Sequence, residues 1–376
     1  MNIGFDAKRV FLNNTGLGNY SRDTIRVLSH FFPENKYFLF TPKEHQKNNV
    51  SFLNGSENTV TRTPKSFIDR FFTSYWRSKR VVKYMVADNI DLFHGLSHEI
   101  PLGIEKTDIK TVVSIHDLIF IRYPQLFRSL DRKIYYKKFK SACDRSDKII
   151  AVSKQTKQDV IEFFGIPEEK IDVVYQGCNE VFHHEVPDKT KRAVQIKYNL
   201  PEEYILSVGR IEERKNLLTI LKTLLELPHQ KLVVIGSGKR YKMECIRFIE
   251  KHDLSDRVLF LTGIETEEMA AVYQNAQMLI YPSIFEGFGI PILEALFSKT
   301  PVISTKQGCF FEAGGPYTKY IDPLSVHEMK EAVLEIQHSI DLQNTMVSKG
   351  FEYAQNFTDH KIASSLFQVY NTLLDD

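Results

Sequence analysis

Glu286 and Glu294 stand eight positions apart around a glycine-containing loop, in a segment that begins with the apolar run of residues 278–281. The apolar run predicts a strand, and Pro291 just after the loop marks the first turn of a helix. One glutamate then lies on the loop and the other inside the helix. The N–H groups at a helix start are unpaired and attract phosphate, whereas a carboxylate can accept hydrogen bonds from sugar hydroxyls. The segment therefore predicts a site for a ligand that carries both groups, such as a sugar nucleotide.

Arg210 and Lys215 follow the predicted strand of residues 204–208. Two cations at a sheet edge can neutralise a diphosphate, the arginine as a planar fork and the lysine as a point charge. The alternative is a solvated run of charge. The nearby turn at Gly236 and Gly238 lacks the earlier glycine and the Ser or Thr of a P-loop, which excludes that triphosphate-binding motif.

His116 and Asp117 follow the predicted strand of residues 110–115, at the sheet edge where open α/β folds bind ligands. A histidine at this place either binds a ligand or serves the fold. Gly16 precedes a predicted helix, where a glycine either allows close approach of a ligand or supplies a positive φ. A dinucleotide-binding fingerprint is a poor alternative, because its first glycine should directly follow the strand and Ser21 stands where its third glycine should be.

Apolar runs alternate with helical patterns along most of the chain, which predicts two doubly wound α/β domains with mainly parallel sheets. The polar segment of residues 183–199 is the best candidate for the linker between them. We expect strands at residues 3–5, 37–40, 90–94, 110–115, 148–152 and 171–175 in the first half, and at 204–208, 231–235, 257–261, 278–281 and 301–305 in the second.

Length and composition agree with two domains, because 376 residues with 43% hydrophobic and 26% charged content can bury two cores. Residues 1–190 carry 29 Lys and Arg against 23 Asp and Glu, so the first half is the basic one. The four cysteines lack metal-binding spacing and indicate a reducing compartment. We expect a cytoplasmic protein, because the sequence shows neither a signal peptide nor an apolar run of about 20 residues.

The segment of residues 62–84 combines seven basic residues with a single acid, Asp69. It allows two interpretations: a helix that packs its aromatic side chains inward, or one that makes weak peripheral contact with an anionic membrane. We expect no nucleic-acid partner, because no recognised binding motif is present and the chain is nearly neutral. The aromatic residues of the segment are Phe67, Phe71, Phe72, Tyr75, Trp76 and Tyr84.

Together these segments resemble a retaining glycosyltransferase of family 4. The resemblance covers nearly the whole chain and is most specific at residues 286–294, where two glutamates enclose seven residues. It implies the GT-B architecture, with two facing Rossmann-like domains and a cleft between them. Residues 1–190 would form the acceptor-side domain, residues 191–358 would bind the nucleotide-sugar donor, and a last helix at 359–374 would pack back on the first domain.

The resemblance also implies roles in the reaction. Arg210 and Lys215 would bind the donor diphosphate, and Glu286 would hold hydroxyls of the transferred sugar. His116 would reach that sugar from the first domain, and Asp117 is a further candidate. Breaking the bond between sugar and phosphate builds negative charge on the leaving group, so fixed cations would lower the barrier.

The remaining donor-binding residues are implied mainly through their backbone. Glu294 is the exception, since its carboxylate would hold the ribose hydroxyls. Gly16 and Ile290 would contribute N–H groups to the diphosphate, Phe288 and Gly289 would contact the sugar, and Gly236 and Gly263 would border the base.

No Asp-x-Asp triplet occurs, and metal-dependent glycosyltransferases typically carry one, so we expect neither a metal nor a cofactor. No residue is an obvious nucleophile, which favours attack on the same face as the leaving phosphate. Residues 15–20 and 114–119 are similar to a mannosyltransferase-like branch that builds bacterial surface polysaccharides. This similarity points to GDP-mannose as donor and to a glycan or lipid-linked acceptor. The alternatives are transfer from a UDP-sugar, epimerisation or hydrolysis of a sugar nucleotide, and binding without catalysis.

Overall fold

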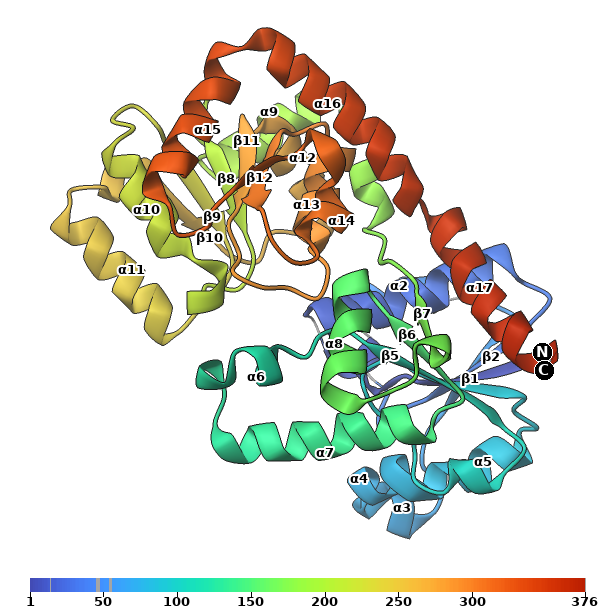
Figure 1. The fold of residues 1–376 in the computed structure, drawn as a ribbon. Coiled ribbons are helices and arrows are strands. Elements are labelled where there is room, and N and C mark those ends of the chain that lie inside the picture. The colour runs from blue at the N-terminus through green and yellow to red at the C-terminus, as the bar shows by residue number, and fades with distance from the viewer. Residues whose placement is uncertain (14, 45–47, 54–55, 376) are drawn as a thin grey trace. The chain divides into compact units, whose positions relative to one another are not determined.

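The computed structural model describes residues 1–13, 15–44, 48–53 and 56–375 (Figure 1). It divides into two compact units, which we call unit 1 (Met1–Gln176 with Asp359–Asp376) and unit 2 (Gly177–Thr358). Each unit contains one sheet in which all paired strands are parallel. The predicted class of two wound, parallel α/β domains is confirmed.

The sheet of unit 1 has the strand order β3-β2-β1-β4-β5-β6-β7. Its order reverses between β1 and β4, which makes the carboxyl ends of these two strands a topological switch point. The strands are β1 (Asn2–Asp6), β2 (Lys36–Phe40), β3 (Thr59–Arg62), β4 (Leu92–Gly95), β5 (Lys110–Ile115), β6 (Lys148–Ala151) and β7 (Ile171–Val173). The helices are α1 (Lys8–Leu12), α2 (Gly16–Phe31), α3 (Phe67–Phe71), α4 (Thr73–Tyr75), α5 (Val81–Ala87), α6 (Ile119–Arg122), α7 (Ser129–Arg145), α8 (Lys154–Phe164) and α17 (Asp359–Asp375).

The sheet of unit 2 has the strand order β10-β9-β8-β11-β12-β13, so its switch point lies between β8 and β11. The strands are β8 (Ile205–Val208), β9 (Leu232–Ile235), β10 (Val258–Leu261), β11 (Met278–Tyr281), β12 (Val302–Thr305) and β13 (Lys319–Ile321). The helices are α9 (Asp188–Lys197), α10 (Leu217–Leu225), α11 (Arg240–Lys251), α12 (Thr266–Asn275), α13 (Ile290–Phe297), α14 (Phe310–Gly314), α15 (Val326–His338) and α16 (Ile340–Ala354).

The boundary between the units falls at residues 176 and 177, earlier than the predicted 190 and 191. The predicted linker at residues 183–199 is also wrong, because it contains α9, which packs on α12. Just before this stretch, Phe182 meets the Tyr273 ring of unit 2 edge-on at a centroid distance of 5.4 Å, and within it Val194 is buried on α9. The segment is polar in composition, yet its few apolar side chains are enough to fix it to a core.

The last helix, α17, belongs to unit 1 and lies along α2 (Figure 1). Phe367 stacks on Phe32 with ring centroids 3.9 Å apart. Deeper in the unit, the Tyr370 hydroxyl is 2.7 Å from Nδ1 of the buried His94. The end of the chain is thus part of the core of unit 1.

The basic segment of residues 62–84 is not a single helix. It is broken into β3, α3, α4, a π-helical turn at Trp76–Arg80 and α5. Trp76 is fully buried, but the aromatic residues of α3 and α4 are exposed. The interpretation with inward-packed aromatics is therefore wrong for this part of the segment. Among the described residues, no helix combines the length and apolar character needed to cross a membrane.

Candidate active site

The loops that follow β8 and β11 meet at the switch point of unit 2, where open α/β sheets bind ligands. The loop after β8 carries Arg210 and Lys215, and the loop after β11 carries Glu286. A backbone hydrogen bond of 2.8 Å from Ile284 N–H to the Arg214 carbonyl ties the two loops together. Lys215 and Glu286, which are 71 positions apart in the chain, are thereby brought together.

Glu286 forms the centre of an ion cluster at this place. Its Oε1 is 2.6 Å from Nη1 of Arg214 and also contacts the Lys215 ammonium. The ammonium donates a second hydrogen bond of 2.6 Å to the Tyr281 hydroxyl. The side chains of Glu286, Arg214 and Lys215 are each less than a fifth exposed. Lys215 and Glu286, two predicted site residues, are thus in direct contact.

The cluster fixes the charge of Glu286. Burial opposes ionisation of the carboxyl, but the nearby Lys215 and Arg214 cations outweigh it and lower the pKa of Glu286 to about 2. Glu286 is therefore a carboxylate at neutral pH. Burial lowers the pKa of Lys215, and the contact with Glu286 opposes that shift. The cluster can attract a phosphate while its carboxylate accepts hydrogen bonds from hydroxyls.

Arg214 and Tyr281 were not among the predicted site residues. Arg214 stands in the charge run of residues 212–215, and nothing in that run shows which of its members is buried. Tyr281 is the last residue of β11, and its type suited the strand prediction without suggesting a partner. Only the folded arrangement shows that both contact the residues at the centre of the site.

Arg210 is in a different environment from Lys215, because 68% of its side chain is exposed. Its Nε lies 3.9 Å from Glu212, and it lines a small hollow at the carboxyl end of β8 together with Gly209 and Lys215. The structure therefore places the two predicted phosphate ligands beside one hollow. Arg210 is free to reorient, whereas Lys215 is held in place.

Glu294 lies half-buried in α13, the helix that follows the loop of Glu286. Its Oε2 accepts a hydrogen bond of 2.6 Å from the hydroxyl of Tyr273, which is fully buried on α12. Gly289 precedes the helix with a φ of +120°, and Ile290 is its first residue. The predicted loop and helix start are thus present, and Tyr273 is a further residue that orients the second glutamate.

We expect Tyr273→Phe to raise KM for the donor severalfold while kcat changes little, because Glu294 loses the hydrogen bond that orients it. Tyr204→Phe is a matched control. Its hydroxyl donates to the Val272 carbonyl at 2.6 Å from an equally buried position, without touching Glu294. Both variants should lose about 1 kcal/mol of stability. Steady-state kinetics and melting curves test this, and an equal KM for both variants would contradict the role of Tyr273.

Two predicted donor-binding glycines have structural reasons of their own. A Cβ on Gly236 would lie 1.8 Å from the Gly209 carbonyl oxygen, so this turn requires glycine for packing alone. Gly263 has open space around it and a φ of +69°, which favours glycine through backbone conformation. Phe288 is buried, and its carbonyl accepts a hydrogen bond of 3.0 Å from the Cys309 thiol. Their roles toward a nucleotide stay predictions.

Gly16 and Asp117 lie at two helix starts in unit 1. Gly16 is the first residue of α2 and does not have a positive φ, so that explanation of its type is wrong. Gly18 requires glycine for packing, because a Cβ there would lie 2.0 Å from the Asn13 carbonyl oxygen, whereas close approach of a ligand at Gly16 stays a prediction. Asp117 stands two positions before α6 and accepts a hydrogen bond of 3.1 Å from Ile119 N–H.

His116 is buried at the end of β5, and both of its ring nitrogens face protein groups. Nε2 is 2.9 Å from the Leu96 carbonyl oxygen and therefore carries the proton, while Nδ1 is 3.3 Å from the Gln176 amide. Burial lowers the pKa of His116 to about 4, so the ring is neutral at pH 7. Its environment satisfies the requirements of a structural histidine, and its role toward a sugar stays a prediction.

The buried histidines of unit 1 predict a loss of stability in mild acid. Burial lowers the pKa of His94 to about 3, that of His116 to about 4 and that of His98 well below its ordinary value. The unfolded chain binds protons below about pH 6.5 that the folded chain does not. The histidines therefore do not lower the free energy of unfolding above pH 6.5. Between pH 6.5 and pH 4, each of them lowers it by about 1.4 kcal/mol per pH unit.

Melting temperatures between pH 7 and pH 5 test this expectation. His116→Gln should make the melting temperature fall less steeply with pH, whereas the same change at the exposed His327 should leave the slope as it is. Identical slopes for wild type and His116→Gln would contradict the assigned protonation state.

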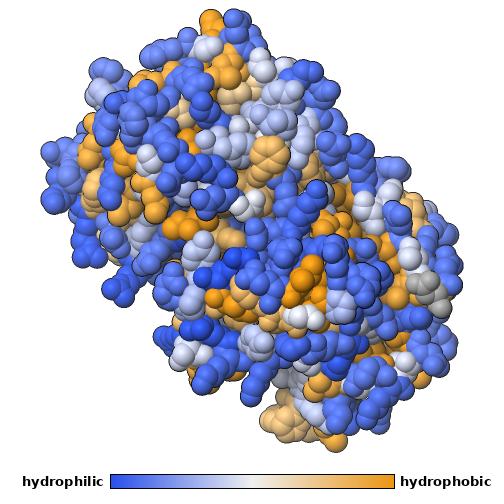
Figure 2. Space-filling view, in the orientation of Figure 1, coloured by the Kyte–Doolittle hydropathy of each residue, from blue (hydrophilic) through white to orange (hydrophobic). Residues whose placement is uncertain are grey.

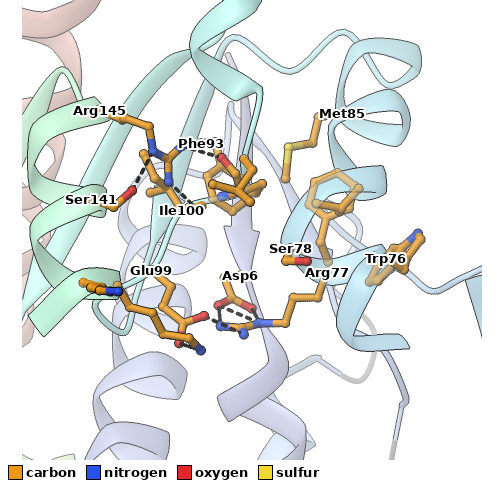
Figure 3. Close-up of a pocket in the computed structure, with 16 residues that line it drawn as sticks. Asp6, Trp76, Arg77, Ser78, Met85, Phe93, Glu99, Ile100, Ser141 and Arg145 are labelled. Carbon is orange, nitrogen blue, oxygen red and sulfur yellow. Dashed lines mark hydrogen bonds and ion pairs between the residues drawn. The ribbon is translucent and has the colours of Figure 1, made fainter. Parts of the chain in front are cut away.

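A second hollow lies in unit 1, between α5 and α7 at the carboxyl end of β1 (Figure 3). Its volume is about 240 Å³, and its walls are largely apolar. At one end Arg77 Nε donates to Asp6 Oδ1 at 3.0 Å, and Arg77 Nη1 is 2.9 Å from Glu99. The labelled lining residues in Figure 3 are Asp6, Trp76, Arg77, Ser78, Met85, Phe93, Glu99, Ile100, Ser141 and Arg145.

Within the described ranges, no group of three or more His, Cys, Asp or Glu side chains is placed to hold a metal ion. The four cysteines, Cys143, Cys178, Cys245 and Cys309, are buried and form no disulfide.

Solved structures share this fold. The chain superimposes on sucrose-phosphate synthase from Thermosynechococcus elongatus with a TM-score of 0.78 and 19% identity, over 100% of this chain and 99% of that one. A glycosyltransferase from Rickettsia africae gives a TM-score of 0.76 and 17% identity, over 100% and 99% of the two chains. Anabaena Alr3699/HepE, solved in complex with UDP-glucose, gives 0.77 and 15%, over 99% and 100%. With its two Rossmann-like units, the protein has the GT-B fold.

Two family models match the sequence, "Glycosyltransferase Family 4" at residues 29–181 and "Glycosyl transferases group 1" at residues 188–352. The O-antigen chain mannosyltransferase RfbU of Salmonella typhimurium is 28% identical, over 76% of each chain. The O-antigen chain mannosyltransferase B of Escherichia coli is 24% identical, over 75% of this chain and 74% of the relative. The chain belongs to the GT-B glycosyltransferases of the family 4 type.

Proposed function

We propose that the protein is a retaining, metal-independent hexosyltransferase that moves mannose from GDP-mannose to a glycan or lipid-linked acceptor. The acceptor would be an intermediate of a surface polysaccharide. Two kinds of observation support this proposal. The relatives RfbU and mannosyltransferase B are O-antigen chain mannosyltransferases by name, and unit 2 carries a charged cluster suited to a sugar diphosphate.

The contact of Glu286 with Arg214 and Lys215 at the switch point carries the proposal. A leaving nucleoside diphosphate gains negative charge as the glycosyl bond breaks, and cations held in a buried place stabilise that charge without reorganising. The guanidinium of Arg210 would bind the diphosphate from the exposed side of the hollow. Glu286 would exchange part of its ion pairing for hydrogen bonds from the hydroxyls of the sugar, and Glu294 would hold the ribose.

Retention is proposed to occur by attack on the same face as the leaving phosphate, which takes the proton of the acceptor hydroxyl. A covalent route would need a carboxylate free to attack the sugar carbon. Glu286 is a poor nucleophile in this environment, because two cations share its charge. His116 and Gly16 remain predicted donor ligands from unit 1.

Melting curves with GDP, UDP and ADP test the donor, because a ligand that binds only the folded chain raises its melting temperature. We expect the largest rise with GDP and turnover of GDP-mannose that is unchanged by EDTA. A larger rise with UDP would instead favour a UDP-sugar. Incubation with the donor alone distinguishes transfer from epimerisation, hydrolysis and simple binding. An epimerised or hydrolysed sugar nucleotide indicates one of the first two activities, and binding with no turnover on any acceptor indicates a binding protein.

A further inference from the structure

Unit 1 exposes a cluster of large apolar side chains on α3, α4 and the residue between them. Phe67 is 84% exposed and Phe71 is 74% exposed, and the other three are at least half exposed. Figure 2 shows a pale orange protrusion at its lower edge, where Figure 1 places these two helices. We call this surface the aromatic face; it consists of Phe67, Ile68, Phe71, Phe72 and Tyr75.

The acidic residue of α3, Asp69, points inward. Asp69 is 1% exposed, forms an ion pair with Arg80 and accepts a hydrogen bond of 2.9 Å from the Tyr84 hydroxyl. Its backbone N–H is capped at 3.1 Å by Ser66 Oγ. A surface helix normally does the reverse, with its charged residues toward water and its apolar stripe toward the core. Because the contacts of the buried Asp69 hold α3 in this orientation, the outward aromatics are a fixed feature of the fold.

The segment that carries the aromatic face is positively charged. Lys65, Arg70, Lys79 and Lys83 flank the face in sequence and are exposed, and the only acid in residues 64–86 is the buried Asp69. Exposed apolar clusters on proteins mark contact surfaces, and the surrounding charge indicates what they contact. A partner of this surface must therefore be apolar at its centre and anionic at its edge.

We propose that the aromatic face seats unit 1 on an anionic phospholipid bilayer. The aromatic side chains would enter the boundary between headgroups and acyl chains, and the four cations would lie at the level of the headgroup phosphates. A second copy of the chain fits less well, because a symmetric contact would bring the same cations against each other. The inference goes beyond the proposed function, since binding to a bilayer does not depend on the transfer reaction.

The hollow of Figure 3 is lined by Trp76, which directly follows Tyr75 of the aromatic face in the chain. Trp76 and Ser78, which follow α4, line one side of the hollow. Leu102 also lines it, and its N–H donates a hydrogen bond of 2.7 Å to the Ser78 carbonyl. Leu102 is itself half exposed. Docking through the aromatic face would bring this largely apolar hollow close to the headgroup layer.

Flotation of the full chain with vesicles tests the proposal. At low salt we expect binding to vesicles of phosphatidylcholine with phosphatidylglycerol and little binding to phosphatidylcholine alone. The variant Phe67→Ser/Phe71→Ser should bind the anionic vesicles at least about tenfold more weakly. Ile340→Ser is the matched control, because Ile340 is 72% exposed in unit 2 and its replacement should change nothing. Both variants replace exposed side chains, so their melting temperatures should equal that of the wild type.

The charge requirement is tested by Lys79→Gln/Lys83→Gln, which should weaken binding to the anionic vesicles about tenfold, as should raised salt. The proposal is overturned if the wild type does not float with anionic vesicles at low salt, or if the Phe67→Ser/Phe71→Ser variant floats equally well. It is also overturned if sedimentation shows a dimer that this variant abolishes, since the partner is then a second copy. The melting response to GDP should be the same in all variants, so failure here leaves the donor proposal intact.

Discussion

Lys215→Ala should lower kcat/KM for transfer from the nucleotide sugar by about a thousandfold, or about 4 kcal/mol of transition-state stabilisation. The Lys215 ammonium contacts Glu286 and the Tyr281 hydroxyl from a nearly buried position beside the hollow at β8. It is therefore the cation best placed to meet the leaving diphosphate without reorganising. Most of the loss should appear in kcat, because the charge it stabilises develops as the bond breaks.

Lys222→Ala is the matched control, because Lys222 is an exposed lysine on α10 close in sequence to Lys215 and outside the ion cluster. Glu286→Gln should also lower activity strongly. In the double variant with Lys215→Ala, the combined loss should be much less than the sum of the two single losses, because the residues act as one unit. A Lys215→Ala enzyme that folds normally and keeps wild-type turnover would contradict the assignment of this cluster.

Arg210→Ala should lower kcat/KM by about a hundredfold with no change in melting temperature. Its side chain is 68% exposed and contacts only Glu212 at 3.9 Å in the contacts described, so the fold does not depend on it. Separation of activity from stability distinguishes this residue from Lys215. Arg247→Ala, an exposed arginine on α11, controls for the loss of a surface cation. Equal kinetics for the two arginine variants would remove Arg210 from the site.

Most of the fold could be predicted from the sequence, because buried parallel strands are short apolar runs. All eleven predicted strands are present, and the run at residues 278–281 matches β11 residue for residue. The two missed strands, β3 (Thr59–Arg62) and β13 (Lys319–Ile321), are at the edges of their sheets. β3 and β13 contain polar and charged residues, which partly covered edge strands tolerate, and they lack the apolar run on which the prediction depends.

The candidate site could be predicted in outline but not in its contacts. Motif spacing identified Glu286 and Lys215, yet no spacing showed that they touch or that Arg214 joins them. Tyr273 could not be predicted either, because its hydroxyl reaches Glu294 across 21 positions of sequence. Such contacts depend on how α12 and α13 pack, and packing is set by the whole core.

The basic aromatic segment shows the limit of pattern analysis in a different way. Its composition allowed both an inward and an outward orientation of the aromatics, since helical periodicity does not state which stripe faces the core. The ion pair of the buried Asp69 with Arg80 decides the orientation of α3. The available signal in the sequence was Asp69, the single acid among seven basic residues. When this acid pairs with a base on the inner side of the helix, the aromatic residues on the opposite side face solvent.

The configuration of the transferred sugar tests the central claim most directly. The protein would be incubated with GDP-mannose and a set of soluble glycoside acceptors, and the product would be analysed by mass spectrometry and NMR. We predict an acceptor heavier by one hexose, linked with the same anomeric configuration as in the donor, and loss of this product in Lys215→Ala. A product of inverted configuration, or consumption of the donor without any glycosylated acceptor, would contradict a retaining glycosyltransferase.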